Sequence, residues 1–98
     1  MINQLTLCAH ISQLDALRYT PAGLPVLMMV LQHHSTQEEA GQDRSVTCEV
    51  QAKLFGDAAK TWQHAQDSMV KVTGFLSQKS LRNPRLVLHI QTIELHKG

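Results

Sequence analysis

The chain is poor in aromatic residues, cysteine and charge, and each shortage excludes a class of protein. Aromatic residues make up 4% of the 98 residues and charged residues 17%. So few charges, beside a hydrophobic fraction of 43%, exclude a disordered chain and a coiled coil. Two cysteines are too few for the disulfide framework of a small secreted domain. We therefore expect both thiols to be reduced.

Long apolar runs are also missing from the sequence. No run approaches the length of a membrane-spanning helix. Residues 2–14 alternate between apolar and polar types, whereas a signal peptide has a continuous apolar core. We therefore expect a cytoplasmic protein without membrane contact. The net charge of +1 is close to zero, so any affinity for nucleic acid has to come from local groups of cations.

The sequence contains no set of residues typical of an enzyme. It has neither the GxSxG pattern of a nucleophilic serine nor a glycine-rich phosphate loop. Of the six histidines, the neighbours His33 and His34 would point to opposite faces of a strand and could not bind one metal together. We expect no catalysis, no metal, no other cofactor and no small-molecule substrate.

What the sequence does contain is a set of alternating segments that predicts five strands in a single domain, residues 1–98. Two connections, 34–43 and 77–85, are polar and predict loops, and residues 20–25 predict a turn. A short helical pattern stands between the third and fourth strands, at 57–65. The predicted strands are 5–12, 26–31, 46–54, 69–76 and 86–95.

The position of the helix is the most informative feature of this pattern. Five-stranded OB-fold barrels are all-β domains whose single helix lies between strands 3 and 4 and closes the bottom of the barrel. Such barrels bind oligonucleotides across one face and the adjacent loops. We predict this fold. Trp62 has small neighbours in the helix, which favours a role as an apolar plug over a role as a base-stacking platform.

Side-chain alternation also predicts which residues face the barrel interior. In the second strand we place Leu27, Met29 and Leu31 inside. Met28 and Val30 are then apolar on the outer side, where they either lie under a loop or contact a second subunit. We take Met28 and Val30 as candidates for a dimer interface.

Three further positions follow from the same alternation. Cys48 has the parity of an interior residue and is expected in the core. Gly74 would allow the sharp bend that small barrels need. The apolar parity of the last strand shifts near residues 91–92, which predicts a β-bulge there.

A group of cations is the candidate ligand contact. Lys79, Arg82 and Arg85 occur within seven residues without an acid among them. Arg18 and Arg44 are further cations beside predicted strands. A solvated hairpin tip could have the same composition, but together with an OB fold the cations favour salt-sensitive contacts to phosphates.

Several segments together resemble one family over essentially the whole chain. They read RYTPAGLP at 18–25, HHSTQEEAG at 33–41, GF at 74–75, VLHI at 87–90 and IEL at 93–95. In these segments the chain is similar to primosomal replication protein N, the PriB family, whose broader kin are bacterial single-strand DNA-binding proteins. The resemblance implies a homodimer of OB barrels that binds single-stranded DNA. It also implies support of the PriA helicase in replication restart and handover to later primosome loading proteins.

The resemblance assigns the basic positions to DNA contact, and His34 stands where the family has an arginine. The better-known members carry aromatic residues where this chain has Thr47 and Gln42. Because stacking of one base is worth about 1–3 kcal/mol, we expect weak, strongly salt-dependent binding. Tyr19 could supply some stacking. The candidate DNA-binding residues are Arg18, Tyr19, His34, Arg44, Lys79, Arg82 and Arg85.

Two alternatives fit the same sequence. In the first, the protein is an interaction adaptor that docks on the helicase and touches DNA only incidentally, as the near-neutral charge and the two missing aromatics would favour. In the second, the barrel binds RNA, which differs only through recognition of the 2′-hydroxyl.

Overall fold

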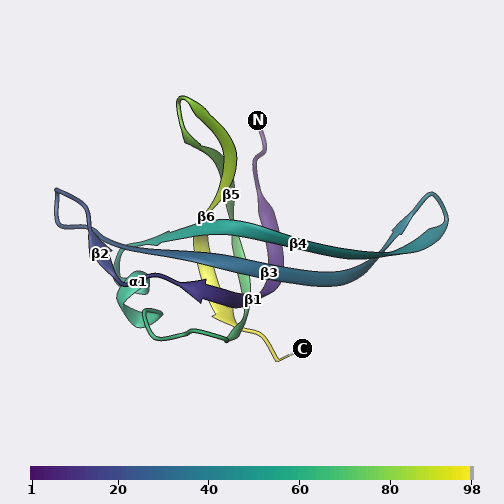
Figure 1. Cartoon of the computed structure of the whole chain (residues 1–98), viewed down its shortest axis with the longest axis horizontal. Helices are drawn as coiled ribbons and strands as arrows, with labels where there is room; N and C mark the ends of the chain where they lie inside the picture. The colour runs from purple at the N-terminus through teal and green to yellow at the C-terminus, as the bar shows by residue number, and fades with distance from the viewer. Residues whose placement is uncertain (98) are drawn as a thin grey trace.

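The secondary structure consists of strands and one short helix, which lies at one end of the barrel (Figure 1). The structure is a computed structural model and describes residues 1–97; the predicted domain also includes Gly98, which lies outside the described residues. The described elements are β1 (Leu5–Leu14), β2 (Arg18–Tyr19), β3 (Pro25–Glu39), β4 (Gln42–Phe55), α1 (Asp57–Thr61), β5 (Met69–Ser80) and β6 (Asn83–Leu95).

The barrel closes through β1, which pairs with two different strands. Residues 5–10 of β1 pair antiparallel with β5, and residues 10–14 pair antiparallel with β3. The circuit is completed by the antiparallel pairs β3–β4 and β5–β6 and by the parallel pair β4–β6. β2 is an extra two-residue strand beside the start of β3. The five long strands therefore form the predicted OB-fold barrel, with the helix between the third and fourth of them.

The interior of the barrel is apolar throughout the described residues. The predicted inward positions Leu27, Met29 and Leu31 are all buried. Because neighbouring residues of a strand point to opposite faces, the residues between them stand on the outer surface. The buried core also includes Ala9, Ile11, Ala52, Leu54, Ala59, Val70, Val72, Leu88 and Ile90.

The helix is shorter than predicted but occupies the expected place. It ends at Thr61, four residues before the predicted end, and Trp62 is its C-cap. Ala59 is fully buried, and Trp62 is half-buried against the core. Trp62 therefore packs as the predicted plug.

The prediction of a loop over residues 34–43 is wrong. β3 continues to Glu39 and β4 begins at Gln42, so these residues form a long hairpin that leaves the barrel (Figure 1). Its turn uses positive φ angles at Ala40 and Gly41. Both faces are polar because an arm beyond the barrel has no core to cover, which is why alternation did not reveal a strand.

The same geometry corrects the prediction for Cys48. It has the parity of the core residues but is exposed, because β4 has already left the barrel at this point. At the base of the arm, the Nδ1–H of His33 donates to the carbonyl oxygen of Cys8 over 2.7 Å, which ties β3 to β1.

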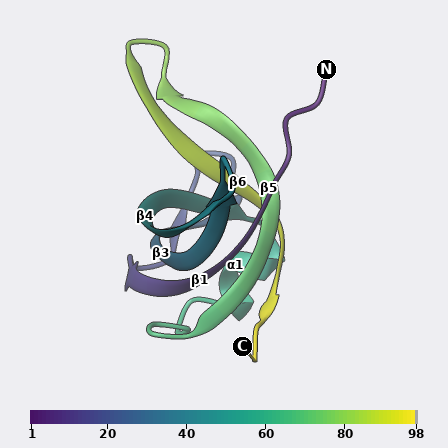
Figure 2. The ribbon, with the colours of Figure 1, turned by 90° about the vertical axis from the view of Figure 1, so that its right-hand side faces the viewer.

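The predicted loop over residues 77–85 is also wrong. β5 runs to Ser80 and β6 starts at Asn83, so only Leu81 and Arg82 form the turn. The resulting β5–β6 hairpin rises from the barrel on the side of β3 and β4 (Figure 2). The predicted bulge is confirmed: Thr73 pairs with Thr92 and Gly74 with Ile90, which leaves Gln91 as the extra residue.

Candidate nucleic-acid interface

A groove runs over the outer faces of β3 and β4, beneath the β5–β6 hairpin. It contains two adjoining hollows that share Gln13, Val30 and Gln51. Barrel closure brings β1 to one side of this groove and the hairpin to the other. The groove is therefore lined by residues from all five long strands of the barrel.

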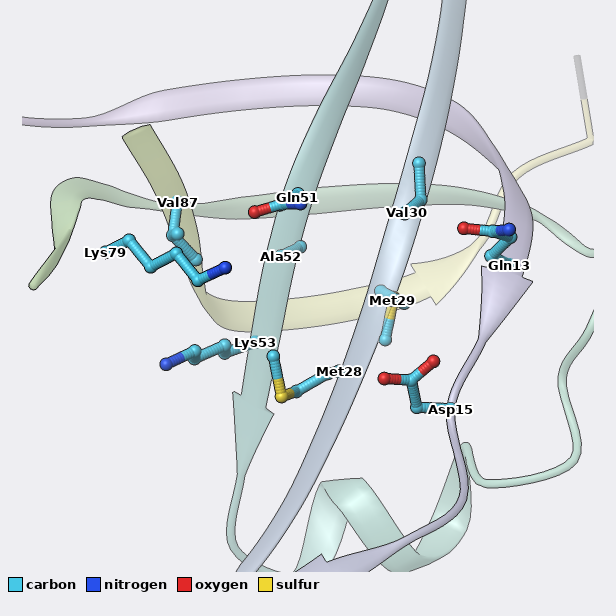
Figure 3. Close-up of a pocket in the computed structure, with 10 residues that line it drawn as sticks. All are labelled: Gln13, Asp15, Met28, Met29, Val30, Gln51, Ala52, Lys53, Lys79 and Val87. Atoms are coloured by element: carbon cyan, nitrogen blue, oxygen red, sulfur yellow. The ribbon is translucent and has the colours of Figure 1, made fainter. Parts of the chain in front are cut away.

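The first hollow has a volume of about 170 Å³ (Figure 3). A closed cavity of about 150 Å³ holds a benzene ring, so this hollow is large enough for one aromatic ring. Met28 and Val30 of β3 line it with apolar atoms, and Val87 of β6 is almost completely buried behind it.

Charge is distributed unevenly around this hollow. Lys79 and Lys53 lie on the hairpin side, and the carboxylate of Asp15 lies on the β1 side (Figure 3). The amides of Gln13 and Gln51 provide both donors and acceptors. A polyanion would therefore run along the lysine side, with its planar groups directed over the methionine and valine.

The second hollow, of about 400 Å³, continues the groove along β4. Arg85 and Leu86 of the hairpin line it together with Glu49 of β4. Of the predicted basic cluster, Lys79 and Arg85 thus reach the groove. Arg82 is exposed in the turn and lines neither hollow.

His34 extends the same outer face onto the β3–β4 arm. It pairs with Thr47 across the hairpin, and its Nδ1 lies 3.1 Å from the Thr47 hydroxyl oxygen. Both are exposed. They stand in the row that begins with Met28 and Val30, so a ligand leaving the groove along β3 would meet them.

Arg44 does not share that face. It pairs with Gln37, and both residues point to the face opposite that of His34 and Thr47. The Nη1 of Arg44 lies 3.1 Å from Glu39 Oε1. Gln42 stands on the same opposite face, paired with Glu39. Exposed ion pairs of this kind contribute little, so Arg44 remains available to a phosphate, but on the other side of the arm.

Arg18 and Tyr19 lie on β2, beyond the far edge of β3. Arg18 is opposite Val26, on the outer face, and Tyr19 is opposite Pro25. Both are exposed, but neither lines a hollow of the groove. The structure thus gathers Lys79 and Arg85 and leaves the other predicted cations spread over the surface.

Comparison with known proteins gives the family. The sequence model described as "Another single-strand binding protein family" matches residues 3–92. The replication restart protein PriB of Neisseria meningitidis serogroup B is 46% identical over 96 residues, which cover 98% of this chain and 96% of that protein. The Proteus mirabilis protein of the same name is 38% identical over 97 residues, 95% of this chain and 92% of that one.

The chain belongs to the PriB family of single-strand binding proteins. Solved structures agree with this assignment. The protein PriB from Ralstonia solanacearum superimposes with a TM-score of 0.89 at 32% identity, over 98% of this chain and 99% of that one. The single-stranded DNA binding protein from Thermus aquaticus gives 0.77 at 26% identity, over 99% of this chain and 51% of that one.

Sequence reasoning missed part of the groove of this PriB-family chain. Lys53 was not among its candidates, although it shares the outward parity of Gln51 and Thr47 in an alternating strand. Gln13 could not be found in this way, because only barrel closure brings β1 beside β3. Met28 and Val30 were predicted as dimer contacts, and the structure places both in the groove.

Two further observations concern this PriB-family barrel. Within residues 1–97, no three histidine, cysteine, aspartate or glutamate side chains are arranged to hold a metal ion. In the same part of the chain no helix has the length and apolar character needed to cross a membrane.

Proposed function

We propose that the chain is a non-enzymatic accessory of replication restart that binds single-stranded DNA. In this role it supports the PriA helicase at stalled forks and helps pass the DNA to later primosome loading proteins, in the cytoplasm. The family assignment and the OB barrel support the proposal. The helicase and the loading proteins are inferred from the family.

The observation that carries the proposal is the groove under the β5–β6 hairpin. It combines Lys53, Lys79 and Arg85 along one side with the apolar side chains of Met28 and Val30. Phosphates attract cations whatever the sequence, and bases need an apolar or aromatic surface when they leave the stack. Single-stranded DNA presents both groups, spaced along one flexible chain.

Phosphate contacts make the affinity depend on salt in a calculable way. For single strands, the logarithm of the association constant falls by about 0.7 per tenfold rise in salt for each phosphate contacted. We expect fluorescence anisotropy of a labelled dT oligonucleotide to show this decline. A flat salt response would contradict electrostatic binding.

A pair of charge deletions tests the groove itself. The double variant Lys79→Ala, Arg85→Ala should bind the oligonucleotide more weakly and with a shallower salt slope. Its melting temperature should stay unchanged, because both side chains are exposed. Lys60→Ala, Lys71→Ala is the matched control: it removes the same charge from exposed sites outside the groove. Equal losses in both double variants would place the site elsewhere.

The same assay separates DNA from RNA. We expect the dT oligonucleotide to bind at least as tightly as an rU oligonucleotide of equal length. A clear preference for rU would favour the RNA-binding alternative, since the two ligands differ chiefly in the 2′-hydroxyl.

We further propose that the protein works as a homodimer. Met28 and Val30 are half-buried outer residues, and their contact with a second subunit stays a prediction. Met28→Asp, examined by sedimentation equilibrium and by DNA binding, tells the two roles apart. Loss of the dimer would support the interface, whereas loss of DNA affinity in an intact dimer would assign Met28 to the groove alone.

The adaptor hypothesis also has an observation in its favour. Leu81 and Leu86 of the β5–β6 hairpin are 100% and 58% exposed, and exposed apolar side chains are typical of protein contacts. Both the DNA-binding hypothesis and the adaptor hypothesis include contact with the helicase, so the double variant Leu81→Ser, Leu86→Ser should weaken helicase binding in either case. If the Lys79 and Arg85 deletions also weaken helicase binding but leave DNA affinity unchanged, the adaptor hypothesis is the better one.

A further inference from the structure

Three rings form a stack on the outer surface of the barrel, beside the groove. They belong to Phe55 at the end of β4, His89 on β6 and Phe75 on β5. The centroids of His89 and Phe75 are 4.9 Å apart with 10° between the ring planes. Those of His89 and Phe55 are 6.0 Å apart with 14° between the planes.

The stack is on the surface and not in the core. Phe55 follows the buried Leu54, and His89 lies between the buried Leu88 and Ile90, so both point outward. Phe75 pairs with His89 and shares its face. Phe55 and Phe75 are 39% and 36% exposed. Both phenylalanines of the chain therefore stand in one exposed cluster.

The surroundings of the central ring favour its neutral form. Partial burial lowers the pKa of His89 below its ordinary value of 6.5, and the positive charge of Lys53 lowers it further. A neutral imidazole between two phenyl rings adds no charge to the cluster. The positive charge at this place is carried by the Lys53 amine, which also lines the first hollow.

The register of the strands makes the groove and the stack continuous. Lys53 is opposite His89, and Gln51 is opposite Val87, so the outer row of β4 and β6 leads from the hollow to the stack. A strand held by its phosphates at Lys79 and Lys53 would reach the rings within the next nucleotides. Charge therefore favours a nucleic acid as the occupant over an uncharged apolar partner.

We propose that Phe55, His89 and Phe75 form a base-stacking site that takes unstacked bases of the single strand as it leaves the groove. The proposal rests on the proposed function and gives it a second contact, different in kind from the phosphate contacts. Aromatic side chains hold bases of any type, because every base has a π face. This site would supply the stacking that Thr47 and Gln42 cannot provide.

The test compares two ligands of equal charge. One is a dT oligonucleotide, and the other is a phosphodiester chain of the same length made of abasic residues. Binding of each is measured by anisotropy for the wild type, Phe55→Leu, Phe75→Leu and the control Leu95→Ala, an exposed apolar residue outside the cluster. Thermal unfolding of each variant verifies that it is folded.

We expect the wild type to bind dT more tightly than the abasic chain. Each phenylalanine variant should lose about 5-fold or more in dT affinity, in line with the loss of one stacked base. The same variants should keep their affinity for the abasic chain, and Leu95→Ala should change neither.

Other outcomes overturn the proposal in distinguishable ways. If the wild type binds both ligands equally and salt-dependently, the base-stacking site is wrong but the phosphate-binding function stands. Equal losses for both ligands in the phenylalanine variants would also reject base stacking. If the wild type binds neither ligand at low salt, the proposed function fails, and the stacking site fails with it.

Discussion

Lys53 contributes to two neighbouring parts of the outer face. It lines the hollow together with Lys79, and its charge lowers the pKa of His89. The two effects have one cause, the placement of a half-buried cation on β4 directly opposite β6. A single outward lysine thus links the groove to the ring stack.

The lowered pKa of His89 makes stability depend on pH. The unfolded chain takes up the proton near pH 6.5, whereas the folded chain resists it until a lower pH, so the unfolded state binds more protons between the two values. The free energy of unfolding should therefore fall as the pH drops below about 6.5, by the contribution of this residue. Urea unfolding of the wild type and His89→Gln between pH 7.5 and 5 measures it. An identical pH slope in the two proteins would contradict the prediction.

Gly74 is required by a close backbone contact. A Cβ at this position would overlap the carbonyl oxygen of His89 and lie 2.8 Å from its carbonyl carbon. Because backbone atoms cannot move aside easily, Gly74→Ala should lower the free energy of unfolding by about 2 kcal/mol or more.

The control for this glycine is Gly23→Ala. Gly23 has a positive φ but no atom within 4 Å of the added carbon, so it tests the backbone conformation alone, at about 1 kcal/mol. Urea denaturation measures both variants. Equal losses of unfolding free energy in the two variants would show that small shifts of the backbone relieve the close contact at Gly74.

At the scale of the elements, the two hairpins extend beyond the barrel. β3 and β4 pair with each other as far as Glu39 and Gln42, but β1 pairs with β3 only up to Gln32. The arm thus has one hydrogen-bonded neighbour on each strand and no core beneath it. Opening of the arm would therefore leave the core of the barrel covered.

This difference predicts a gradient of hydrogen exchange. Backbone amides of residues 34–47 should exchange faster than those of residues 26–32, because opening the arm breaks few buried contacts, whereas opening the barrel exposes the core. Exchange measured by mass spectrometry on the intact protein tests this. Addition of the dT oligonucleotide should slow exchange at the base of the arm, near His34. Equal protection along β3 would contradict the prediction.

At the scale of the whole molecule, closure of the barrel creates the groove. β1 turns from β5 to β3 near His10, which brings Gln13 and Asp15 beside Met28 and opposite the lysines. Gln13 and Asp15 are close together in the sequence, but Met28 and the two lysines come from other strands, which are distant in the chain. The groove exists because five strands share one small circumference.

Much of the barrel could be predicted because it depends on local patterns. A strand that buries one face must alternate between apolar and polar residues, so the sequence predicted the burial of Leu27, Met29 and Leu31. The shift of the apolar positions in the last strand predicted the bulge at Gln91. The hairpin arms escaped prediction for the same reason. A polar strand with solvent on both faces has the composition of a loop.

The sequence by itself determined the strands of the barrel, the place of its helix and the inward face of its core, since these follow from the solubility of each side chain. It also contained Lys79 and Arg85 as an acid-free basic cluster. Only the tertiary structure decided that Lys79 shares a hollow with Lys53 and Met28 and that Arg85 lines the adjoining one. It also decided that Arg44 faces away and that Phe55, His89 and Phe75 stack. Alternation fixes the face on which a residue lies, but its neighbours on that face depend on the register between strands that are distant in the chain.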